Sequence, residues 1–361
     1  MKVMLVCGAR PNFIKLLPLL AEIRKFPQEF IPILVHTGQH YDYEMSKIFF
    51  EDLLLPEPDI HLGVGSFSHA EQTARIMISF EEAVLAQKPD LVIVVGDVNS
   101  TLACSLVVSK IGIPLAHIEA GLRSFDRRMP EEINRILTDR LADYLFTPFE
   151  EANENLIKEG TNKENIYLVG NIMMDSLILK KDRINNSKIL ENLGVGDQNY
   201  ALLTLHRPSN VDIEENLAGI LDAINVISER INILFPVHPR TKKRIEEFKL
   251  SARTRNLVLL NALGYLDFLC FERHAKFVLT DSGGMQAETT FLGVPCLTLR
   301  ESTEWTITLI HGTNVLVGIG KEKIIEESFK ILDGIEKDGK PPSIWDGKTS
   351  ERIVRVLRKQ K

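Results

Sequence analysis

Short apolar runs alternate with longer amphipathic stretches along the whole chain. The runs are rich in Val, Ile and Leu and have no polar face, so they predict strands that are buried on both sides. The first series of expected strands is Val3–Cys7, Ile31–His36, Leu91–Val95, Pro114–Ile118, Tyr144–Phe146 and Ile166–Val169. The second series is Ala201–Leu205, Ile231–Val237, Leu257–Leu260, Phe277–Leu279, Cys296–Leu299 and Val315–Val317. Stretches between them, such as IKLLPLLAEIRKF, have the period of amphipathic helices.

Two successive series of strands and helices predict an α/β protein with two Rossmann-like, doubly wound domains. The polar segment KKDRINNSKILENLGVGDQN falls between the two series, and we place the domain junction near residues 170–198. The expected domains are therefore residues 1–170 and 171–349. A last helix, at about 350–361, has no strand after it and is expected to cross back to the first domain.

Composition and charge exclude several classes of protein. A formal net charge of −6 gives no basis for general nucleic-acid binding. No apolar run reaches the roughly 18 residues of a membrane helix, and the N-terminal run is too short for a signal peptide. Cys7, Cys104, Cys270 and Cys296 lie far apart in apolar segments without a C-x-x-C pair. We therefore expect free buried thiols, a cytoplasmic location and no membrane partner.

Polar residues directly after the strands are the first candidates for chemistry, because open parallel sheets bind ligands beyond the carboxyl ends of their strands. In GARPNFIK, Arg10 and Lys15 place two cations near a helix start, which suits an anion site; surface charge at an ordinary turn is the alternative. Asp97 follows the third run, where it could instead cap the next helix. Glu119 follows the fourth run, and Glu131 opens the helix after that loop.

The second series also places polar residues at its strand ends. His206 and Arg207 follow one run directly, although a histidine buried in the core is an alternative interpretation of His206. His238 follows the next run in the same way. These positions predict a second set of ligand-binding side chains in the second domain.

The stretch LTDSGGMQAE predicts a phosphate cradle. Ser282, Gly283 and Gly284 follow a strand and open a helix, so backbone N–H groups can approach an anion closely. Glu288, about one turn later, would repel phosphate but could hold a ribose diol. Together these residues predict a nucleotide diphosphate ligand.

Acids and a histidine beside a diphosphate suit proton transfer, and Asp97, Glu119, Glu131 and His206 are the candidates. A metal centre is the rival chemistry. None of the predicted helices carries an H-x-x-x-H or E-x-x-H pair, and His117 with Glu119 would supply too few ligands. We therefore expect no metal.

Several stretches, in order along nearly the whole chain, resemble the non-hydrolysing UDP-N-acetylglucosamine 2-epimerases. The matching stretches are GARPNFIK, HTGQHYDYEMSKIFFEDL, GDVNSTLA, HIEAGLRSFDRRMPEEINRILTD, LLTLHRPSNVD, VHPRTKKR, LTDSGGMQAE and GTNVLVG. The resemblance implies a GT-B fold with the active site in the interdomain cleft, and usually a homodimer. It also implies interconversion of UDP-GlcNAc and UDP-ManNAc, with a UDP-sugar as the substrate and no added cofactor.

By motif position, the resemblance implies a role for each candidate. The catalytic constellation is matched by Asp97, Glu119, Glu131 and His206. The candidates for substrate binding are Arg10, Lys15, Arg123, Arg135, His238, Phe268, Ser282, Gly283, Gly284, Glu288 and Arg300. In some bacterial relatives a second UDP-GlcNAc binds as an activator at positions that resemble Gln39, His40, Gln72 and Arg207.

Two positions depart from the family pattern. Trp305 stands where the family often has an arginine, and Ala287 stands where a glutamate is common. Related enzymes that act on UDP-2,3-diacetamido glucuronate also carry T-E-W. The alternatives are therefore a 2-epimerase for a UDP-2,3-diacetamido-2,3-dideoxy uronate, or a GT-B glycosyltransferase.

The sugar C2 proton is hardly acidic, because no carbonyl group adjoins that carbon. The resemblance implies that UDP is eliminated to leave 2-acetamidoglucal, and that UDP then adds back while the proton returns on the opposite face. The loop at 117–132 would carry acids to the sugar. Arg123 and Arg135 would keep those acids ionised or brace the loop, whereas Arg127 and Arg128 are expected on the surface.

Overall fold

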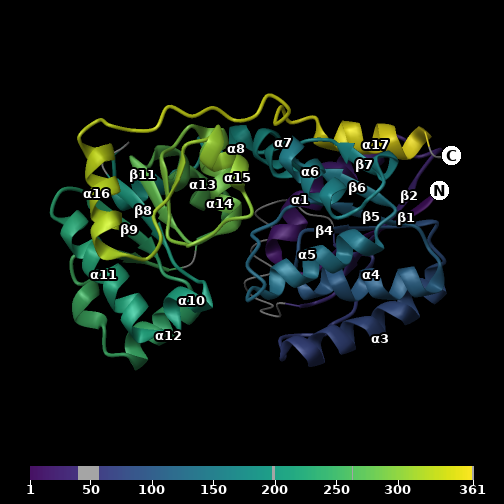
Figure 1. Cartoon of the computed structure of the whole chain (residues 1–361), viewed down its shortest axis with the longest axis horizontal. Coiled ribbons are helices and arrows are strands. Elements are labelled where there is room, and N and C mark those ends of the chain that lie inside the picture. Colours follow the sequence, from purple (N-terminus) through teal and green to yellow (C-terminus); the bar gives the residue numbers. More distant parts are fainter. Residues whose placement is uncertain (40–56, 197–199, 262, 360–361) are drawn as a thin grey trace. The chain divides into compact units, whose positions relative to one another are not determined.

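The computed structural model describes residues 1–39, 57–196, 200–261 and 263–359, and the chain forms two compact units. Unit 1 comprises Met1–Lys180 and Ser343–Lys361, and unit 2 comprises Lys181–Pro342 (Figure 1). Each unit is built on one parallel sheet, and the predicted fold class, two Rossmann-like α/β domains, is confirmed.

Within the described part of unit 1, seven parallel strands form a sheet in the order β3-β2-β1-β4-β5-β6-β7. The strands are β1 (Lys2–Cys7), β2 (Ile31–His36), β3 (Ile60–His61), β4 (Leu91–Val95), β5 (Leu115–Ile118), β6 (Tyr144–Thr147) and β7 (Ile166–Leu168). The helices are α1 (Arg10–Ile23), α3 (His69–Gln87), α4 (Asn99–Ile111), α5 (Pro130–Leu141), α6 (Glu150–Lys158), α7 (Ile172–Leu179) and α17 (Thr349–Lys359).

The apolar strands of unit 1 are buried because helices cover the sheet. Every residue of β4, LVIVV, is buried, as a central parallel strand requires. Met4 and Val6 of β1 pack with Ile76 and Phe80 of α3 in one continuous apolar core. This packing leaves the carboxyl ends of β1, β4 and β5 as the part of the sheet where polar side chains gather.

Within the described part of unit 2, six parallel strands follow the order β10-β9-β8-β11-β12-β13. The strands are β8 (Tyr200–Thr204), β9 (Asn232–Pro236), β10 (Val258–Leu260), β11 (Phe277–Thr280), β12 (Cys296–Thr298) and β13 (Asn314–Leu316). The helices are α8 (Lys181–Asn185), α9 (Ile189–Leu193), α10 (Pro208–Val211), α11 (Glu214–Ser228), α12 (Pro239–Glu247), α13 (Tyr265–His274), α14 (Gly283–Leu292), α15 (Thr306–Ile310) and α16 (Lys321–Leu332).

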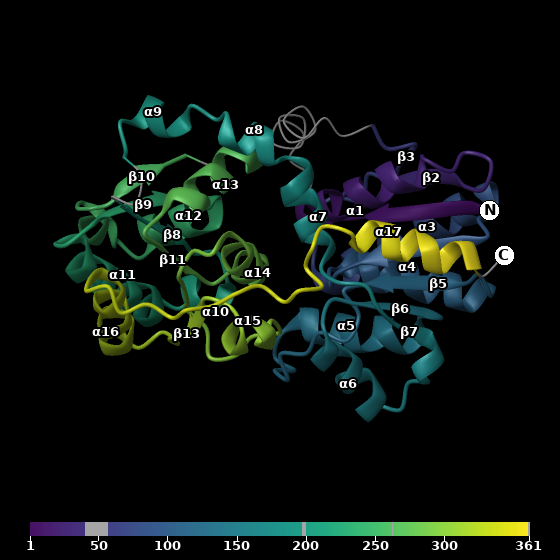
Figure 2. The same ribbon diagram turned by 90° about the horizontal axis from the view of Figure 1, so that it is seen from above.

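The C-terminal helix α17 belongs to unit 1, where it packs against α1 and α7 (Figure 2). Asp175 of α7 accepts hydrogen bonds from the backbone N–H groups of Thr349 at 3.1 Å and Ser350 at 2.7 Å, and so binds the first turn of α17. Unit 1 consequently extends to Lys180 and resumes at Ser343, beyond the limits expected from the sequence.

Two local features differ from the sequence prediction. The short strand β3, Ile60–His61, was not predicted, because two residues are too few to show a period. The polar segment that the sequence prediction assigns to the domain junction forms two short helices, α8 and α9, which pack on α13. Ser187 Oγ donates to Asp267 Oδ1 at 2.6 Å in that contact.

Candidate active site

The carboxyl ends of β1, β4 and β5 bring together the polar residues predicted for unit 1. Strands β1 and β4 are neighbours in the sheet although β2 and β3 lie between them in sequence, and such a switch point is where doubly wound sheets bind ligands. Lys15 comes from α1 after β1, Asp97 follows β4 and Glu119 follows β5. The predicted residue His40 and the side chain of Arg10 lie outside the described residues.

Lys15 and Glu119 form a buried ion pair. Lys15 Nζ lies 2.6 Å from Glu119 Oε2, and the side chains are 11% and 4% exposed. Glu119 has a φ of 70°, a left-handed conformation that costs a non-glycine residue roughly 1–3 kcal/mol. Its second oxygen, Oε1, is buried without a hydrogen-bond partner among the described residues. Backbone strain and a bare carboxylate oxygen together indicate a side chain held for chemistry.

Asp97 lies beside this pair in a fixed orientation. Arg135 Nη2 donates to Asp97 Oδ2 at 2.7 Å, and the Asp97 side chain is 31% exposed. Gly96 precedes it with a φ of 71°, and a Cβ there would lie 3.6 Å from both charged atoms of the Lys15–Glu119 pair. The turn after β4 therefore runs directly against the ion pair, and glycine permits that approach.

Glu131 opens α5 and is half-buried, while its neighbour Glu132 braces the preceding loop. Glu132 accepts the backbone N–H groups of Ser124 at 2.9 Å and Phe125 at 3.0 Å, and it also pairs with Arg135. The sequence prediction gave the bracing role to arginines and missed Glu132. Carboxylate bonds to backbone N–H groups depend on the loop conformation, which no sequence pattern revealed.

Arg123 is buried and binds two protein carboxylates. Its Nη1 lies 2.7 Å from Asp139 Oδ2, and its Nη2 lies 2.7 Å from Glu159 Oε2. Arg127 and Arg128 are exposed, as expected. Arg123 therefore lies in a buried charge network, and substrate binding by this residue stays a prediction.

Gln39 and Gln72 belong to a buried hydrogen-bond network. Gln39 Oε1 accepts from the backbone N–H of Ser100 at 2.9 Å. Gln72 Nε2 donates to the backbone oxygen of Gln39 at 3.0 Å, and Asn99 Nδ2 donates to Gln72 Oε1 at 2.8 Å. Both glutamines are buried, so in this structure they bind to the protein itself.

In unit 2, His206 lies at the equivalent switch point, where β8 and β11 are neighbours. His206 Nδ1 lies 3.0 Å from Asp281 Oδ1; the histidine side chain is 40% exposed and the aspartate side chain is 0% exposed. The carboxylate also accepts the backbone N–H groups of His206 at 3.0 Å and Arg207 at 2.9 Å.

Burial by itself would raise the pKa of Asp281, but the charge of His206 and these backbone N–H groups outweigh burial and lower the pKa. An ionised Asp281 orients the ring and keeps hydrogen on Nδ1, which leaves Nε2 for a ligand. The sequence analysis missed this pairing. The sequence places H-R-P and T-D directly after two predicted strands. Only the strand order of the folded sheet shows that these two strands are neighbours.

The predicted phosphate loop begins α14. Ser282 is the N-cap residue and makes no side-chain capping bond, and α14 starts at Gly283. A Cβ on Gly283 would lie 2.3 Å from Glu304 Oε1 and 3.7 Å from Trp305 Nε1, so a side chain there would displace the Glu304 carboxylate. Arg300 Nη2 donates to Glu304 Oε2 at 2.7 Å. The start of a helix suits an anionic group, and here the carboxylate of Glu304, paired with Arg300, lies beside it.

The other predicted residues of unit 2 lie on several elements. Tyr265 Oη donates to Glu288 Oε1 at 2.7 Å; burial and then the Glu288 charge raise the pKa of Tyr265, so its hydroxyl keeps its hydrogen. Phe268 on α13 is partly buried against an apolar cluster. His238 caps α12 by accepting a backbone N–H two residues later at 3.2 Å, and its ring centroid lies 6.0 Å from that of His206.

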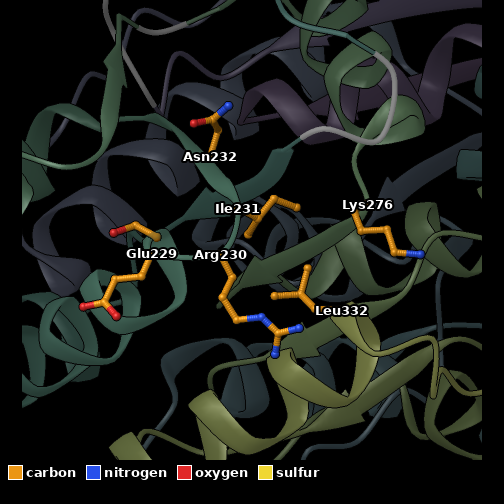
Figure 3. Close-up of a pocket in the computed structure, with 7 residues that line it drawn as sticks. Glu229, Arg230, Ile231, Asn232, Lys276 and Leu332 are labelled. Atoms are coloured by element: carbon orange, nitrogen blue, oxygen red, sulfur yellow. The ribbon is translucent and has the colours of Figure 1, made fainter.

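A hollow of about 580 Å³ lies at the opposite end of the sheet of unit 2 (Figure 3). Ile231 and Asn232 mark the amino end of β9, and Lys276 directly precedes β11. Arg230 at this hollow is already paired with Asp333 at 2.6 Å. The position at the amino ends of the strands separates it from the predicted ligand-binding residues.

Two further searches cover only the part of the chain that the structure describes. There, no group of three or more His, Cys, Asp and Glu side chains is arranged to hold a metal ion. None of the helices there is both long enough and apolar enough to span a membrane.

Known proteins resemble this chain over its whole length. A family model described as UDP-N-acetylglucosamine 2-epimerase matches residues 22–358. A UDP-N-acetylglucosamine 2-epimerase homolog of Methanococcus maripaludis is 49% identical over 363 residues, and the match covers 99% of each chain. A UDP-2,3-diacetamido-2,3-dideoxy-D-glucuronate 2-epimerase of Pseudomonas aeruginosa is 41% identical, with 99% of this chain and 100% of that protein covered.

A crystal structure of the Methanocaldococcus jannaschii UDP-GlcNAc 2-epimerase in complex with UDP-GlcNAc and UDP is also similar. It superposes with a TM-score of 0.92 at 43% identity, and the match covers 99% of this chain and all of that one. The resemblance seen in the sequence motifs is thus confirmed. The chain belongs to the UDP-N-acetylglucosamine 2-epimerase family, a family of isomerases.

Proposed function

We propose that this protein interconverts UDP-N-acetylglucosamine and UDP-N-acetylmannosamine by inverting C2 of the sugar. The observation that carries the proposal is Glu119, a buried carboxylate bound to Lys15 through one oxygen and bare at the other, beside Asp97. The C2 proton becomes removable only as UDP leaves C1. The reaction therefore needs acid/base groups, which unit 1 supplies, and a cradle for diphosphate, which unit 2 supplies.

Glu119, Asp97 and Glu131 are the proposed acid/base groups at C2. Elimination transfers the C2 proton to a base and breaks the C1–O bond, so that UDP leaves and 2-acetamidoglucal forms. Re-addition joins UDP to C1 and returns a proton to the opposite face of C2. Inversion requires proton transfer on both faces of the ring, which two carboxylates can perform. Lys15 and Arg135 direct these carboxylates.

Unit 2 is proposed to bind the nucleotide and stabilise the leaving group. The loop Ser282–Gly284 binds the diphosphate, Glu288 binds the ribose and Phe268 contacts the uracil. His206, oriented by Asp281, stabilises or protonates the departing diphosphate. Removing one such electrostatic group costs roughly 2.7–4 kcal/mol of transition-state stabilisation.

Deuterium incorporation tests the proposed function directly. Incubation with UDP-N-acetylglucosamine in deuterated water should place deuterium at C2 of both epimers. Absence of exchange in the folded protein would contradict the proposal. Release of free N-acetylmannosamine and UDP would instead identify a hydrolysing enzyme, and transfer of the sugar to an acceptor without exchange would identify a glycosyltransferase.

A second candidate substrate is a UDP-2,3-diacetamido-2,3-dideoxy uronate. Trp305 borders the proposed diphosphate loop, 3.7 Å from where a Cβ on Gly283 would lie. It stands where the family often has an arginine, and a relative that is 41% identical carries this activity in its name. Side-by-side turnover of both UDP-sugars would decide between them.

We propose that a second UDP-GlcNAc activates the enzyme through Gln39, Gln72 and Arg207. Hydrogen bonds support a connection to the acids, because Gln72 binds Asn99, and Asn134 Nδ2 donates both to Asn99 at 3.3 Å and to the Asp97 backbone oxygen at 2.9 Å. A rate that rises more steeply than hyperbolically with UDP-GlcNAc would support activation. A hyperbolic curve would oppose it.

We also propose a homodimer. The apolar side chains Ile78 and Leu85 of α3 are 64% and 58% exposed, which a second copy of the chain could cover. Sedimentation of the full chain should give twice the monomer mass, and Ile78→Lys with Leu85→Lys should shift it toward monomer. A monomeric wild type would contradict this proposal.

A further inference from the structure

A histidine–aspartate pair is buried directly behind the acids of unit 1. His117 of β5 lies with Nδ1 2.6 Å from Oδ1 of Asp139 on α5, and both side chains are 0% exposed. Neither residue has a role in the proposed chemistry. A buried ionisable pair of this kind is costly unless its geometry is well satisfied, so its contacts indicate its purpose.

The partners of His117 define which ring nitrogens carry hydrogen. Nε2 lies 2.8 Å from the backbone oxygen of Gly96, which can only accept, so Nε2 is a donor. Asp139 Oδ2 accepts from the Gly121 N–H at 3.0 Å and pairs with Arg123 Nη1 at 2.7 Å.

Burial alone would raise the pKa of Asp139, but His117 and Arg123 outweigh burial and lower the pKa. The ionised carboxylate accepts a hydrogen bond from Nδ1. Both nitrogens of His117 thus face acceptor atoms, an arrangement that suits a ring with hydrogen on both nitrogens.

The pair joins the two turns that carry the acids. Gly96, which accepts from the ring, immediately precedes Asp97. Gly121, which donates to the carboxylate, comes two residues after Glu119. A Cβ on Gly121 would lie 2.3 Å from a backbone oxygen of α6, so this turn has little freedom to move on its other side. The histidine and the aspartate thus brace the two turns from behind, in addition to the backbone hydrogen bond from the Gly96 N–H to the Ile118 oxygen at 3.1 Å.

We propose that His117 and Asp139 are positioning residues for the epimerisation, and that the doubly protonated ring holds the turns of Asp97 and Glu119 at the separation that C2 chemistry needs. This inference rests on the proposed function. The ring makes no direct contact with solvent, so it acts through the backbone of Gly96.

Two further charged side chains, Arg123 and Glu159, lie next to the pair among the described residues. Asp139 faces His117 and Arg123, and Arg123 also faces Glu159 of the segment after α6. The network thus contains two cations and two anions. Loss of the ring's charge would leave an excess negative charge behind the acids.

His117→Gln tests the positioning role, because glutamine can still donate to Gly96 but carries no charge. A small displacement of reacting groups can cost about 100-fold in rate, so we expect kcat to fall about 10–100-fold. KM should change less than about threefold, since the proposed nucleotide groups belong to unit 2. The pH dependence of kcat should move toward higher pH, because the ionised acids lose a nearby cation.

The matched control is His274→Gln, a histidine of α13 whose Nδ1 lies 2.8 Å from the backbone oxygen of Cys270 in its own helix. It should leave kcat, KM and the pH dependence unchanged. A merely structural role would lower the melting temperature of His117→Gln without moving the pH dependence of the folded enzyme. Unchanged kcat and pH dependence in folded His117→Gln would overturn the proposal.

The wild-type protein offers a test that needs no substitution. In a ¹⁵N spectrum of histidine-labelled protein at the assay pH, one of the nine histidines should show both ring nitrogens protonated and protected from solvent exchange. A neutral ring there would overturn the proposal even if His117→Gln failed to fold. If the wild type showed no C2 exchange, the proposed function would fail, and this spectrum would still decide the charge of the ring.

Discussion

Each unit holds a histidine against a fully buried aspartate, but the two pairs differ in what can reach the ring. His117 is 0% exposed and has both nitrogens bound within the protein, whereas His206 is 40% exposed and binds Asp281 through Nδ1. A ring with both nitrogens bound can hold neighbouring backbone but cannot pass a proton to a ligand. The solvent exposure of the ring, and not the residue type, therefore distinguishes a positioning histidine from a candidate proton donor.

The same contrast extends to the groups around each pair. In unit 1 the pair lies behind acidic side chains, and one oxygen of Glu119 has no hydrogen-bond partner among the described residues. In unit 2 the pair adjoins a helix start where a side chain on Gly283 would displace the Glu304 carboxylate. Unit 1 is thus suited to proton transfer at carbon, and unit 2 to an anionic leaving group. Substitutions in each unit test this division.

The largest effect is expected from Glu119→Gln. It keeps the size of the side chain but removes the base, so kcat should fall about 10²–10⁴-fold with little change in KM. Rates of epimerisation and of C2 deuterium exchange measure it. The control is Glu154→Gln, whose side chain is 63% exposed. Wild-type exchange in Glu119→Gln would contradict the acid/base role of Glu119.

Asp281→Asn is expected to lower kcat about 100-fold. Its amide would no longer fix hydrogen on Nδ1 of His206, and the ring would lose the carboxylate that stabilises its charged form. The pH dependence of kcat measures the change, with Asp139→Asn assayed in parallel. If both variants altered the pH dependence identically, the distinction between the exposed His206–Asp281 pair and the buried His117–Asp139 pair would be wrong.

Gly283→Ala is expected to weaken binding of UDP at least tenfold, about 1.4 kcal/mol, because a Cβ would lie 2.3 Å from Glu304 Oε1 and push the loop aside. Calorimetric titration with UDP measures the affinity. Gly219→Ala is the matched control, since nothing lies within 4 Å of a Cβ at that helical position. Equal affinities in both variants would argue against a diphosphate cradle in unit 2.

Glu272→Gln should leave activity unchanged and alter only the pH dependence of stability. Both Glu272 carboxylate oxygens are buried without a hydrogen-bond partner among the described residues. Burial, and to a smaller extent the charge of Glu288, raise the pKa of Glu272 well above 4.5. Because its pKa is raised on folding, Glu272 holds its proton more tightly in the folded than in the unfolded state. The resulting contribution to the free energy of unfolding is complete below about pH 4.5 and is lost as the pH rises through the raised pKa.

Between those limits the free energy of unfolding of the wild type should fall about 1.4 kcal/mol per pH unit relative to Glu272→Gln. Denaturant unfolding at several pH values measures this difference. Parallel curves for the two proteins would show that Glu272 is ionised in the folded state.

Much of the candidate site could be read from position along the chain. Asp97, Glu119, His206 and Ser282 each follow an apolar strand, and parallel sheets gather ligand-binding groups at those ends. The partners of these residues could not be read in this way. Asp139 lies 22 residues from His117 and Asp281 lies 75 residues from His206. The first pair joins a strand to the helix that follows it, and the second joins the ends of two neighbouring strands that are distant in sequence.

The amino-acid sequence by itself determined the two-unit α/β fold and the chemical types available at the strand ends, because apolar runs and helical periods are local properties. Only the folded structure shows that His117 is fully buried, that one oxygen of Glu119 has no hydrogen-bond partner among the described residues, and that a side chain at Gly283 would collide with Glu304. Those outcomes depend on burial and on hydrogen bonds between distant segments, which only the assembled sheets create.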